Sequence, residues 1–240
     1  DETWHIVRNI TGVTGFVGPG SKPVPLTDDE VAAFLPEEGR VTTTVGVAVG
    51  DNVDIVDGMF RGYSGRITAI SDDGKPVMNA HLMRLAMEYS AAFGLTVFDH
   101  CEDINLVNSG VMNEGYNSTL LGLRGTTRAA EEVQIARDIV LSRTLNLPIH
   151  ICHVSTAGGV QLIREAKKDG VRITAETAPH YLAGTDDMVQ SYSADTKVNP
   201  PLRLTSDQEA LIAGLCDGTI DAIATDHAPH HRDEKEVEYN

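Results

Sequence analysis

Short apolar runs that each end at a histidine or an acid recur along the second part of the chain. The runs and the residues that follow them are Leu95–Asp99 with His100, Leu147–Cys152 with His153, and Ala222–Ala224 with Asp226. Runs of this length and composition are typical of buried parallel strands. Parallel strands end at a common edge of a sheet, where α/β barrels carry their chemistry. We therefore expect these imidazoles and carboxylates to converge there, in an arrangement that favours a metal site.

Helical patterns separate the predicted strands. Apolar residues three and four positions apart predict four helices, over Met78–Gly94, Thr126–Leu145, Thr156–Gly170 and Ser206–Cys216. Val171–Thr177 reads as a further strand, and residues 104–125 as a long excursion of the kind that active-site loops make. The alternation of strand and helix predicts an α/β fold with a parallel sheet.

The first 70 residues follow a different pattern. Thr27 begins a short helix with a capping-box spacing, and residues 36–47 read as a linker rich in Gly, Glu and Thr. Val49–Val56 alternates as a strand, Asp57-Gly58 is a turn signal, and Gly65–Ile70 reads as the returning strand. This part is expected to be a small β-rich segment.

Net charge, hydropathy and cysteine content exclude several classes of protein for this chain. The net charge of −16 over 240 residues argues against a general nucleic-acid binder, and no apolar run reaches the length of a membrane span. No secretory signal pattern opens the chain, and Asp1 reads as an internal position rather than a natural start. Three cysteines favour a reducing, cytoplasmic setting over a disulfide framework. Cys101 and Cys152 lie in strand contexts that favour packing roles.

Two stretches near the N-terminus resemble a transcription factor. Asp1–Asn9, Gly12–Gly18 and Pro23–Leu26 are similar to the N-terminal domain of the elongation factor NusG, and Val49–Ile70 to the first half of its KOW barrel. The resemblance divides this part into residues 1–47 and 48–70. It implies an elongation or antitermination module whose partner is RNA polymerase or a ribosomal protein.

Residues 71–240 resemble class I dihydroorotase of the amidohydrolase superfamily. The matching stretches are Ser71–Met78, His100–Asp103, Val111–Gly115, His153–Gly158, Thr174–His180, Lys197–Arg203 and Asp217–His230. The resemblance implies the later half of a TIM-like barrel with two zinc ions. It also implies hydrolysis or closure of a cyclic amide in pyrimidine synthesis, with dihydroorotate and carbamoyl aspartate as the substrate pair.

The resemblance also implies roles for single residues. His100 and His153 match histidine ligands of the second metal, and Asp73 matches an aspartate that bridges the metals. Asp226 matches the ligand that also acts as general base and acid. Zinc suits this donor set, and a bound metal can bring the pKa of water to about 7.

Two more residues match positions that contact the substrate in the family. They are Asn199 in the Lys197–Arg203 stretch and His230 near the end of the chain. The short distance in sequence from Asp226 lets His230 reach the same pocket, where it could fix the orientation of the substrate.

Other polar residues have plainer interpretations. A histidine at a strand end is more often a locally satisfied polar residue than a ligand. His150 is expected to face the helices, and His180 is open between a pocket lining and a structural loop residue. Asp72 is expected to form a turn beside Asp73, and Glu131-Glu132 to lie on a solvated helix face.

The departures from the dihydroorotase pattern are as informative as the matches. The His-x-His pair of the first barrel strand is absent, and His5 stands alone. A half-barrel leaves two open strand edges, so either a second chain completes it or the chain joins pieces of two proteins near Ile70-Ser71. The alternatives are therefore a dihydroorotase-type enzyme whose activity by itself is in question, a NusG-like module, and a chimeric chain with no single function.

Overall fold

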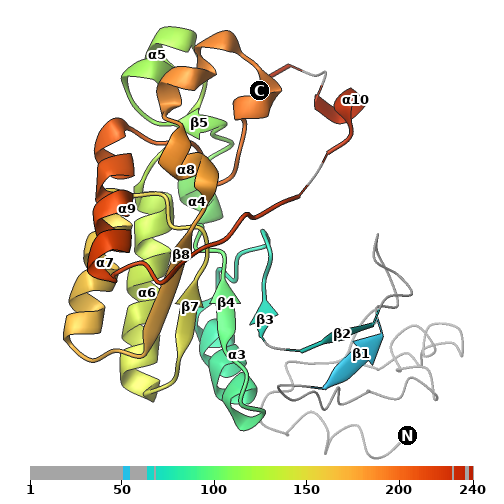
Figure 1. Ribbon diagram of the computed structural model, residues 1–240, viewed down its shortest axis with the longest axis vertical. Coiled ribbons are helices and arrows are strands. Elements are labelled where there is room, and N and C mark those ends of the chain that lie inside the picture. The colour runs from blue at the N-terminus through green and yellow to red at the C-terminus, as the bar shows by residue number, and fades with distance from the viewer. Residues whose placement is uncertain (1–50, 55–63, 68, 229, 236–237, 240) are drawn as a thin grey trace, which may run out of the picture. The chain divides into compact units, whose positions relative to one another are not determined.

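The computed structural model describes residues 51–54, 64–67, 69–228, 230–235 and 238–239 (Figure 1). The chain divides into Asp1–Gly46 and Val47–Asn240. The NusG-like stretch over residues 1–47 lies outside the described residues, so that prediction is not tested by the fold. Within the part that is described, no helix is long and apolar enough to cross a membrane.

Strands and helices alternate through most of the described chain. In order, the elements are β1 (Asn52–Asp54), β2 (Ser64–Arg66), β3 (Ile70–Ser71), α3 (Ala80–Ala92), β4 (Val97–Asp99), α4 (Ile104–Val107), β5 (Met112–Asn113), α5 (Tyr116–Leu121), β6 (Gly125–Thr126), α6 (Ala129–Leu145), β7 (Ile149–Ile151), α7 (Ala157–Lys168), β8 (Ile173–Thr177), α8 (Pro179–Ala183), η1 (Asp186–Ser191), η2 (Ala194–Thr196), α9 (Thr205–Asp217), β9 (Ala222–Ile223) and α10 (Arg232–Lys235).

A five-stranded parallel sheet confirms the predicted α/β fold. Its strand order is β3-β4-β7-β8-β9, so each strand pairs with the next sheet strand along the chain. Val97 pairs with Ile149, and Ile149 pairs with Ile173, so the three central strands are aligned in register. The ends of all five strands therefore lie along one edge, which is where the sequence placed its histidines and acids.

One face of the sheet is covered by helices. α6 packs between α3 and α7, and α7 packs between α6 and α9 (Figure 1). Close approach of α6 and α7 depends on Gly159, where an added Cβ would lie 2.9 Å from the Ile135 side chain. The core lies between the sheet and this layer, and Ile149 and Ile151 are fully buried in it.

The opposite face of the sheet carries polar side chains. His150 alternates with the two buried isoleucines of β7, stacks on Phe98 and contacts Thr174 of β8. The expectation that His150 faces the helices is therefore wrong. In a strand, successive side chains point to opposite faces, so burial of Ile149 and Ile151 under the helices places His150 and Cys152 on the other side.

The region before the sheet departs from the predicted hairpin. β1 and β2 pair antiparallel, with Asn52 opposite Arg66, as the alternating pattern suggested. β2 ends at Arg66, however, while Ile70-Ser71 forms β3 and pairs parallel with β4. The predicted returning strand Gly65–Ile70 is thus divided between two sheets, and the described residues do not confirm a KOW-like barrel.

The long excursion over residues 104–125 has structure of its own. It contains α4, β5 and α5, and its last residue begins β6. β5 and β6 pair parallel in a separate two-stranded sheet. Buried Asn113 on β5 and Asn117 on α5 both donate hydrogen bonds of 2.9 Å to Asp186 of η1. These bonds fix the excursion to a segment about 70 residues later in the chain.

A buried cluster of two acids and one arginine lies between the sheet and α6. Arg137 Nε donates to Asp138 at 2.7 Å, and Arg137 Nη2 donates to Asp99 at 3.2 Å. One guanidinium does not neutralise two buried carboxylates. Burial, reinforced by the charge of Asp138, raises the pKa of Asp99 to about 9.

This raised pKa predicts that alkali destabilises the fold. Between the ordinary pKa of 3.8 and the raised pKa of about 9, the folded chain binds more protons at Asp99 than the unfolded chain does. The free energy of unfolding should therefore fall as the pH rises through this window. The D99N variant, whose amide mimics the protonated acid, should show a flatter profile in urea unfolding from pH 5 to pH 9. A profile as steep as that of the wild type would contradict the assignment.

Candidate metal and substrate site

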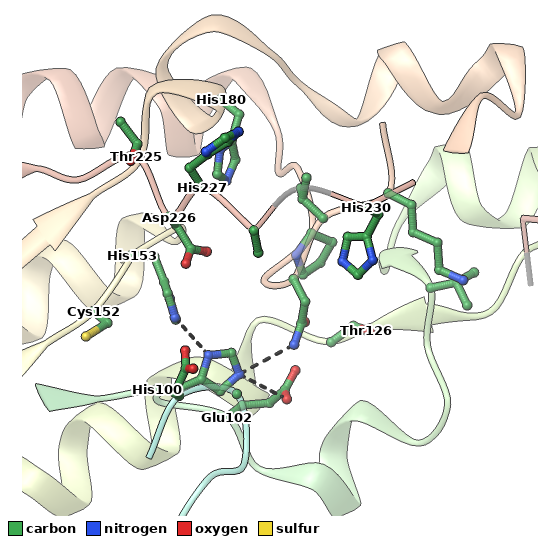
Figure 2. A pocket seen from close by; sticks show the side chains of 18 of the residues that line it. His100, Glu102, Thr126, Cys152, His153, His180, Thr225, Asp226, His227 and His230 are labelled. Atoms are coloured by element: carbon green, nitrogen blue, oxygen red, sulfur yellow. Dashed lines mark hydrogen bonds and ion pairs between the residues drawn. The ribbon is translucent and has the colours of Figure 1, made fainter. Parts of the chain in front are cut away.

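The strand ends open onto one large cavity. Its volume is about 1070 Å³, and the lining includes all six residues predicted from the sequence, namely Asp73, His100, His153, Asn199, Asp226 and His230. Figure 2 labels four of them, His100, His153, Asp226 and His230. Asp73 follows β3, His100 follows β4, His153 follows β7 and Asp226 follows β9. The cavity forms at this edge because each strand ends there and its connection turns outward.

Two of the predicted metal ligands are in direct contact. His100 Nδ1 lies 2.8 Å from His153 Nε2, a hydrogen bond between two buried imidazoles (Figure 2). His100 Nε2 lies 3.2 Å from Glu102 Oε2 and 3.4 Å from Asn199 Nδ2. Asn199 is therefore placed beside His100, as a residue that shares its pocket would be.

The electrostatics keep His153 neutral. Burial and the neighbouring charge of His100 lower the pKa of His153 to about 4. The Nδ1 atom of His153 is buried without a hydrogen-bond partner among the described residues. Burial acts to raise the pKa of Glu102, but the hydrogen bond and charge of His100 prevail and lower it. The site thus holds the neutral imidazole of His153 and the ionised carboxylate of Glu102, the protonation states in which such groups bind metals.

Three of the four predicted metal ligands have left-handed backbone conformations. The φ angle is 40° at Asp73, 38° at His153 and 47° at Asp226. Such angles are uncommon for residues other than glycine, and strained backbone concentrates at functional sites. Asp72 stabilises the first of these turns, because its carboxylate accepts from the backbone N–H of His100 at 2.8 Å and of Val77 at 3.3 Å. The expected turn-forming role of Asp72 is confirmed.

The predicted ligands are imidazole nitrogens and carboxylate oxygens, which are atom types that zinc binds. Two nitrogens that bind one zinc ion at about 2.0–2.1 Å in tetrahedral geometry lie about 3.3 Å apart, so the His100–His153 contact would have to open slightly. The cavity also carries an excess of acids over lysines among the described residues. The acids are Asp73, Glu102, Glu176, Asp195 and Asp226, and the lysines are Lys197 and Lys235. This negative lining suits divalent cations.

A buried acid supports the loop that carries His153. Glu131 on α6 accepts from the backbone N–H of Ser155 at 3.0 Å and of Thr156 at 3.1 Å, and from both hydroxyl groups. It is only 3% exposed, so the expected solvated position of Glu131 is wrong. Its partners, Ser155 and Thr156, lie in the loop between β7 and α7, which no helical periodicity reveals.

Arg203 completes this support from the other side. Its Nε donates to Ser155 Oγ at 3.1 Å, and its Nη1 donates to Asn113 at 3.2 Å and to the carbonyl of Thr126 at 3.0 Å. Its Nη2 lies 4.0 Å from Glu131. Arg203 therefore fixes the stretch that bears Asn199 against the loop that bears His153.

Sequence reasoning assigned no role to Glu102, which the structure places beside His100 in the cavity. Glu102 lies within His100–Asp103, one of the stretches that resemble dihydroorotase, and this position is the sequence feature that could have identified it. His180, left open between two roles, lines the cavity with its Nε2 atom buried and unpaired among the described residues. Burial lowers its pKa, against the opposing charge of Asp226.

Comparison with protein families divides the chain near residue 34. A model of the family described as "Dihydro-orotase-like" matches residues 34–158, just over half of the chain. A model described as "Transcription termination factor nusG" matches residues 1–35. The dihydro-orotase-like match begins well before Ser71, and it includes Val49–Ile70, the stretch that resembles part of a KOW barrel in sequence.

Curated relatives support the first of these matches. A dihydroorotase of Pelobacter propionicus is 59% identical over 228 residues, which is 92% of this chain and 54% of the relative. A dihydroorotase of Acetivibrio thermocellus is 59% identical over 178 residues, or 74% of this chain and 42% of the relative. The chain spans about half the length of these relatives.

Solved structures agree on the fold. L-hydantoinase (dihydropyrimidinase) of Arthrobacter aurescens matches with a TM-score of 0.59 at 24% identity, over 70% of this chain and 38% of that one. D-hydantoinase of Bacillus sp. AR9 matches with a TM-score of 0.60 at 23% identity, over 72% of this chain and 41% of that one. At this identity the likeness concerns the fold alone.

Proposed function

The chain belongs to the dihydro-orotase-like family, and we propose that it forms the later half of a zinc-dependent dihydroorotase. The reaction would open dihydroorotate to carbamoyl aspartate or close it in reverse. The observation that carries this proposal is the convergence of all six predicted site residues on one cavity, with His100 and His153 in contact. Relatives named dihydroorotase, which are 59% identical, support it.

Each side chain would have a defined task. Asp73, His100, His153 and Asp226 would hold up to two zinc ions, which when bound polarise a carbonyl group and lower the pKa of water. Asp226 would take a proton from the attacking water and return it to the leaving ring nitrogen. Asn199, at 3.4 Å from His100, and His230 would orient the substrate. Because dihydroorotate is an anion, metal charge would be needed to offset the acidic lining of the cavity.

A second chain or segment would supply the rest of the barrel. Among the residues that the structure describes, the sheet ends at β3 and β9, where Ile70 is 36% exposed and Ile223 is 53% exposed. On α3, next to that first edge, Leu82, Leu85 and Tyr89 are exposed while Met83 and Met87 are buried. Unpaired strand edges and exposed apolar side chains favour completion by further βα units. Those units would bring the absent His-x-His pair.

A second candidate function is that of a NusG-like module. It concerns residues 1–47, together with residues 48–70, which resemble part of a KOW barrel in sequence. The match of residues 1–35 to a NusG model favours a module that contacts RNA polymerase or a ribosomal protein. A pull-down with polymerase that is lost when residues 1–47 are removed would support it. Equal recovery of polymerase with and without these residues would count against it, and would favour a chimeric chain in which this part has no function.

Zinc binding tests the metal set directly. After chelation and reloading at neutral pH, the chain should retain about one to two zinc ions. The H153N variant should bind zinc at least about 10²-fold more weakly, because it loses a ligand rather than a supporting contact. The matched control is H81N, at an exposed position on α3. Competition with a chromogenic chelator measures both affinities, and unchanged affinity in H153N would refute the assignment of His153.

The catalytic proposal is tested by complementation. The zinc-loaded chain should turn over dihydroorotate when mixed with the N-terminal half of the Pelobacter propionicus dihydroorotase, and far less without it. The absence of turnover in the mixture, with complex formation shown by gel filtration, would overturn the proposed function.

A further inference from the structure

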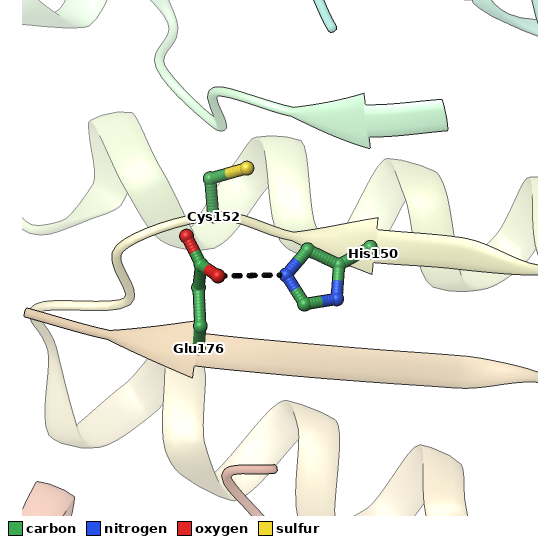
Figure 3. Close-up of side chains that lie close together, drawn as sticks. All are labelled: His150, Cys152 and Glu176. Carbon is green, nitrogen blue, oxygen red and sulfur yellow. Dashed lines mark ion pairs between the residues drawn. The ribbon is translucent and has the colours of Figure 1, made fainter. Parts of the chain in front are cut away.

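A second group of metal-binding side chains lies on the open face of the sheet. His150 and Cys152 belong to β7 and its end, and Glu176 belongs to β8. One ligand atom from each residue lies within 4.8 Å of the other two. Figure 3 shows His150 and Glu176 facing each other between the two strands, with Cys152 close by at the end of β7. None of them is among the residues proposed above to hold zinc.

His150 is oriented toward this group by its neighbours. Its ring stacks on Phe98 at a centroid distance of 4.1 Å, and its Nδ1 atom lies 2.7 Å from the Thr174 hydroxyl group. The side chain is thereby held by contacts that leave Nε2 free to face Glu176. A ligating histidine is commonly fixed in this way through its other ring nitrogen.

The free nitrogen of His150 lacks a satisfactory partner. His150 is 7% exposed, and its Nε2 atom makes no hydrogen bond among the described residues. It lies 3.3 Å from Glu176 Oε2, close enough for an ion pair but out of line for a hydrogen bond. A buried nitrogen that faces a carboxylate oxygen but makes no hydrogen bond is an arrangement that a cation between them would satisfy.

The other comparable group, Asp99, Cys101 and Asp138, differs because a cationic side chain already lies in it. Arg137 already donates hydrogen bonds to both of its acids and supplies the positive charge. Among the residues that the structure describes, no lysine or arginine forms an ion pair with Glu176, which is paired with His150 instead. Cys152 and Glu176 also line the large cavity, so an ion could reach them from solvent.

We propose that His150, Cys152 and Glu176 form a second metal site for zinc or a similar borderline-soft divalent cation. The ligands are His150 Nε2, the Cys152 thiolate and a Glu176 carboxylate oxygen, with a fourth position open to water from the cavity. Nitrogen, sulfur and oxygen ligands of this kind suit zinc and cobalt better than magnesium or calcium. Binding releases the proton of the Cys152 thiol to solvent.

Cobalt provides a probe that separates this site from the other one. The residues proposed for the catalytic zinc include no thiol, so a thiolate-to-cobalt charge-transfer band reports on a cysteine ligand alone. Titration of the chelator-stripped full chain with Co²⁺ should produce this band, and C152S should abolish it. C216S, which changes an exposed cysteine, and H100N, which changes the other site, should both retain it.

Two further measurements keep the test decisive if C152S folds poorly. E176Q retains the thiol but removes a charged ligand, and should raise the Kd of the cobalt band at least about tenfold. Saturating Zn²⁺ should slow alkylation of Cys152 by iodoacetamide in the wild type, read out by peptide mass spectrometry. Absence of the band in the wild type, its survival in C152S, or alkylation unaffected by Zn²⁺ would each overturn the proposal.

Discussion

Replacing Asp226 by asparagine should lower the turnover of dihydroorotate by about 10²–10⁴-fold in the complemented enzyme, the range that a general acid or base contributes. Asp226 lines the cavity together with His153, and it has a left-handed backbone at the end of β9. Asparagine preserves the shape and an oxygen that can bind metal, but it cannot carry a proton between water and the leaving nitrogen. The loss should therefore fall mainly on kcat.

The measurement must separate proton transfer from metal loss. Zinc content and kcat of D226N are determined on the same preparation, with D169N as the matched control at an exposed acid that follows α7. Retained zinc with a large fall in kcat supports the role in proton transfer. A fall in activity that follows zinc content alone would reduce Asp226 to a ligand, and activity within threefold of wild type would exclude both roles.

Prediction from sequence was accurate where the signal is local. The end of a parallel strand is marked by its own apolar run, so the sequence alone predicts His100, His153 and Asp226 at one edge of the sheet. Whether those side chains also share a cavity depends on strand order and register, and the sheet β3-β4-β7-β8-β9 supplies both. The ligand roles themselves stay predictions until metal binding is measured.

Prediction was poor where burial depends on partners remote in sequence. Val133 and Val140 form part of the apolar pattern of α6, yet they are 49% and 57% exposed. The buried positions of this helix instead include the polar residues Glu131, Gln134 and Asp138. Hydrophobic periodicity misses such a face, because the partners of Glu131 lie in the loop after β7 and Asp138 contacts Cys101 after β4.

Glu131 is the clearest case, and its removal should destabilise the fold severely. E131A leaves Arg203 buried without its acid, together with the unsatisfied N–H groups of Ser155 and Thr156. Breaking a buried charge pair from one side typically costs about 3–5 kcal/mol. Burial already lowers the pKa of Arg203, and Glu131 is the largest of the charges that oppose this effect, so E131A removes the main charge that offsets the burial of the arginine. Urea unfolding of E131A against wild type measures the loss.

The same variant should also weaken zinc binding, because the supported loop carries His153. Changes to residues that orient metal ligands typically reduce affinity by 10–100-fold. E131Q keeps the shape and should lose less stability than E131A, since one carbonyl oxygen can still accept from the loop. E165A, at an exposed acid on α7, should unfold within about 0.5 kcal/mol of wild type. If E131A matched E165A in both stability and zinc affinity, the buried acid would be incidental, and the position of His153 would have to depend on the strand alone.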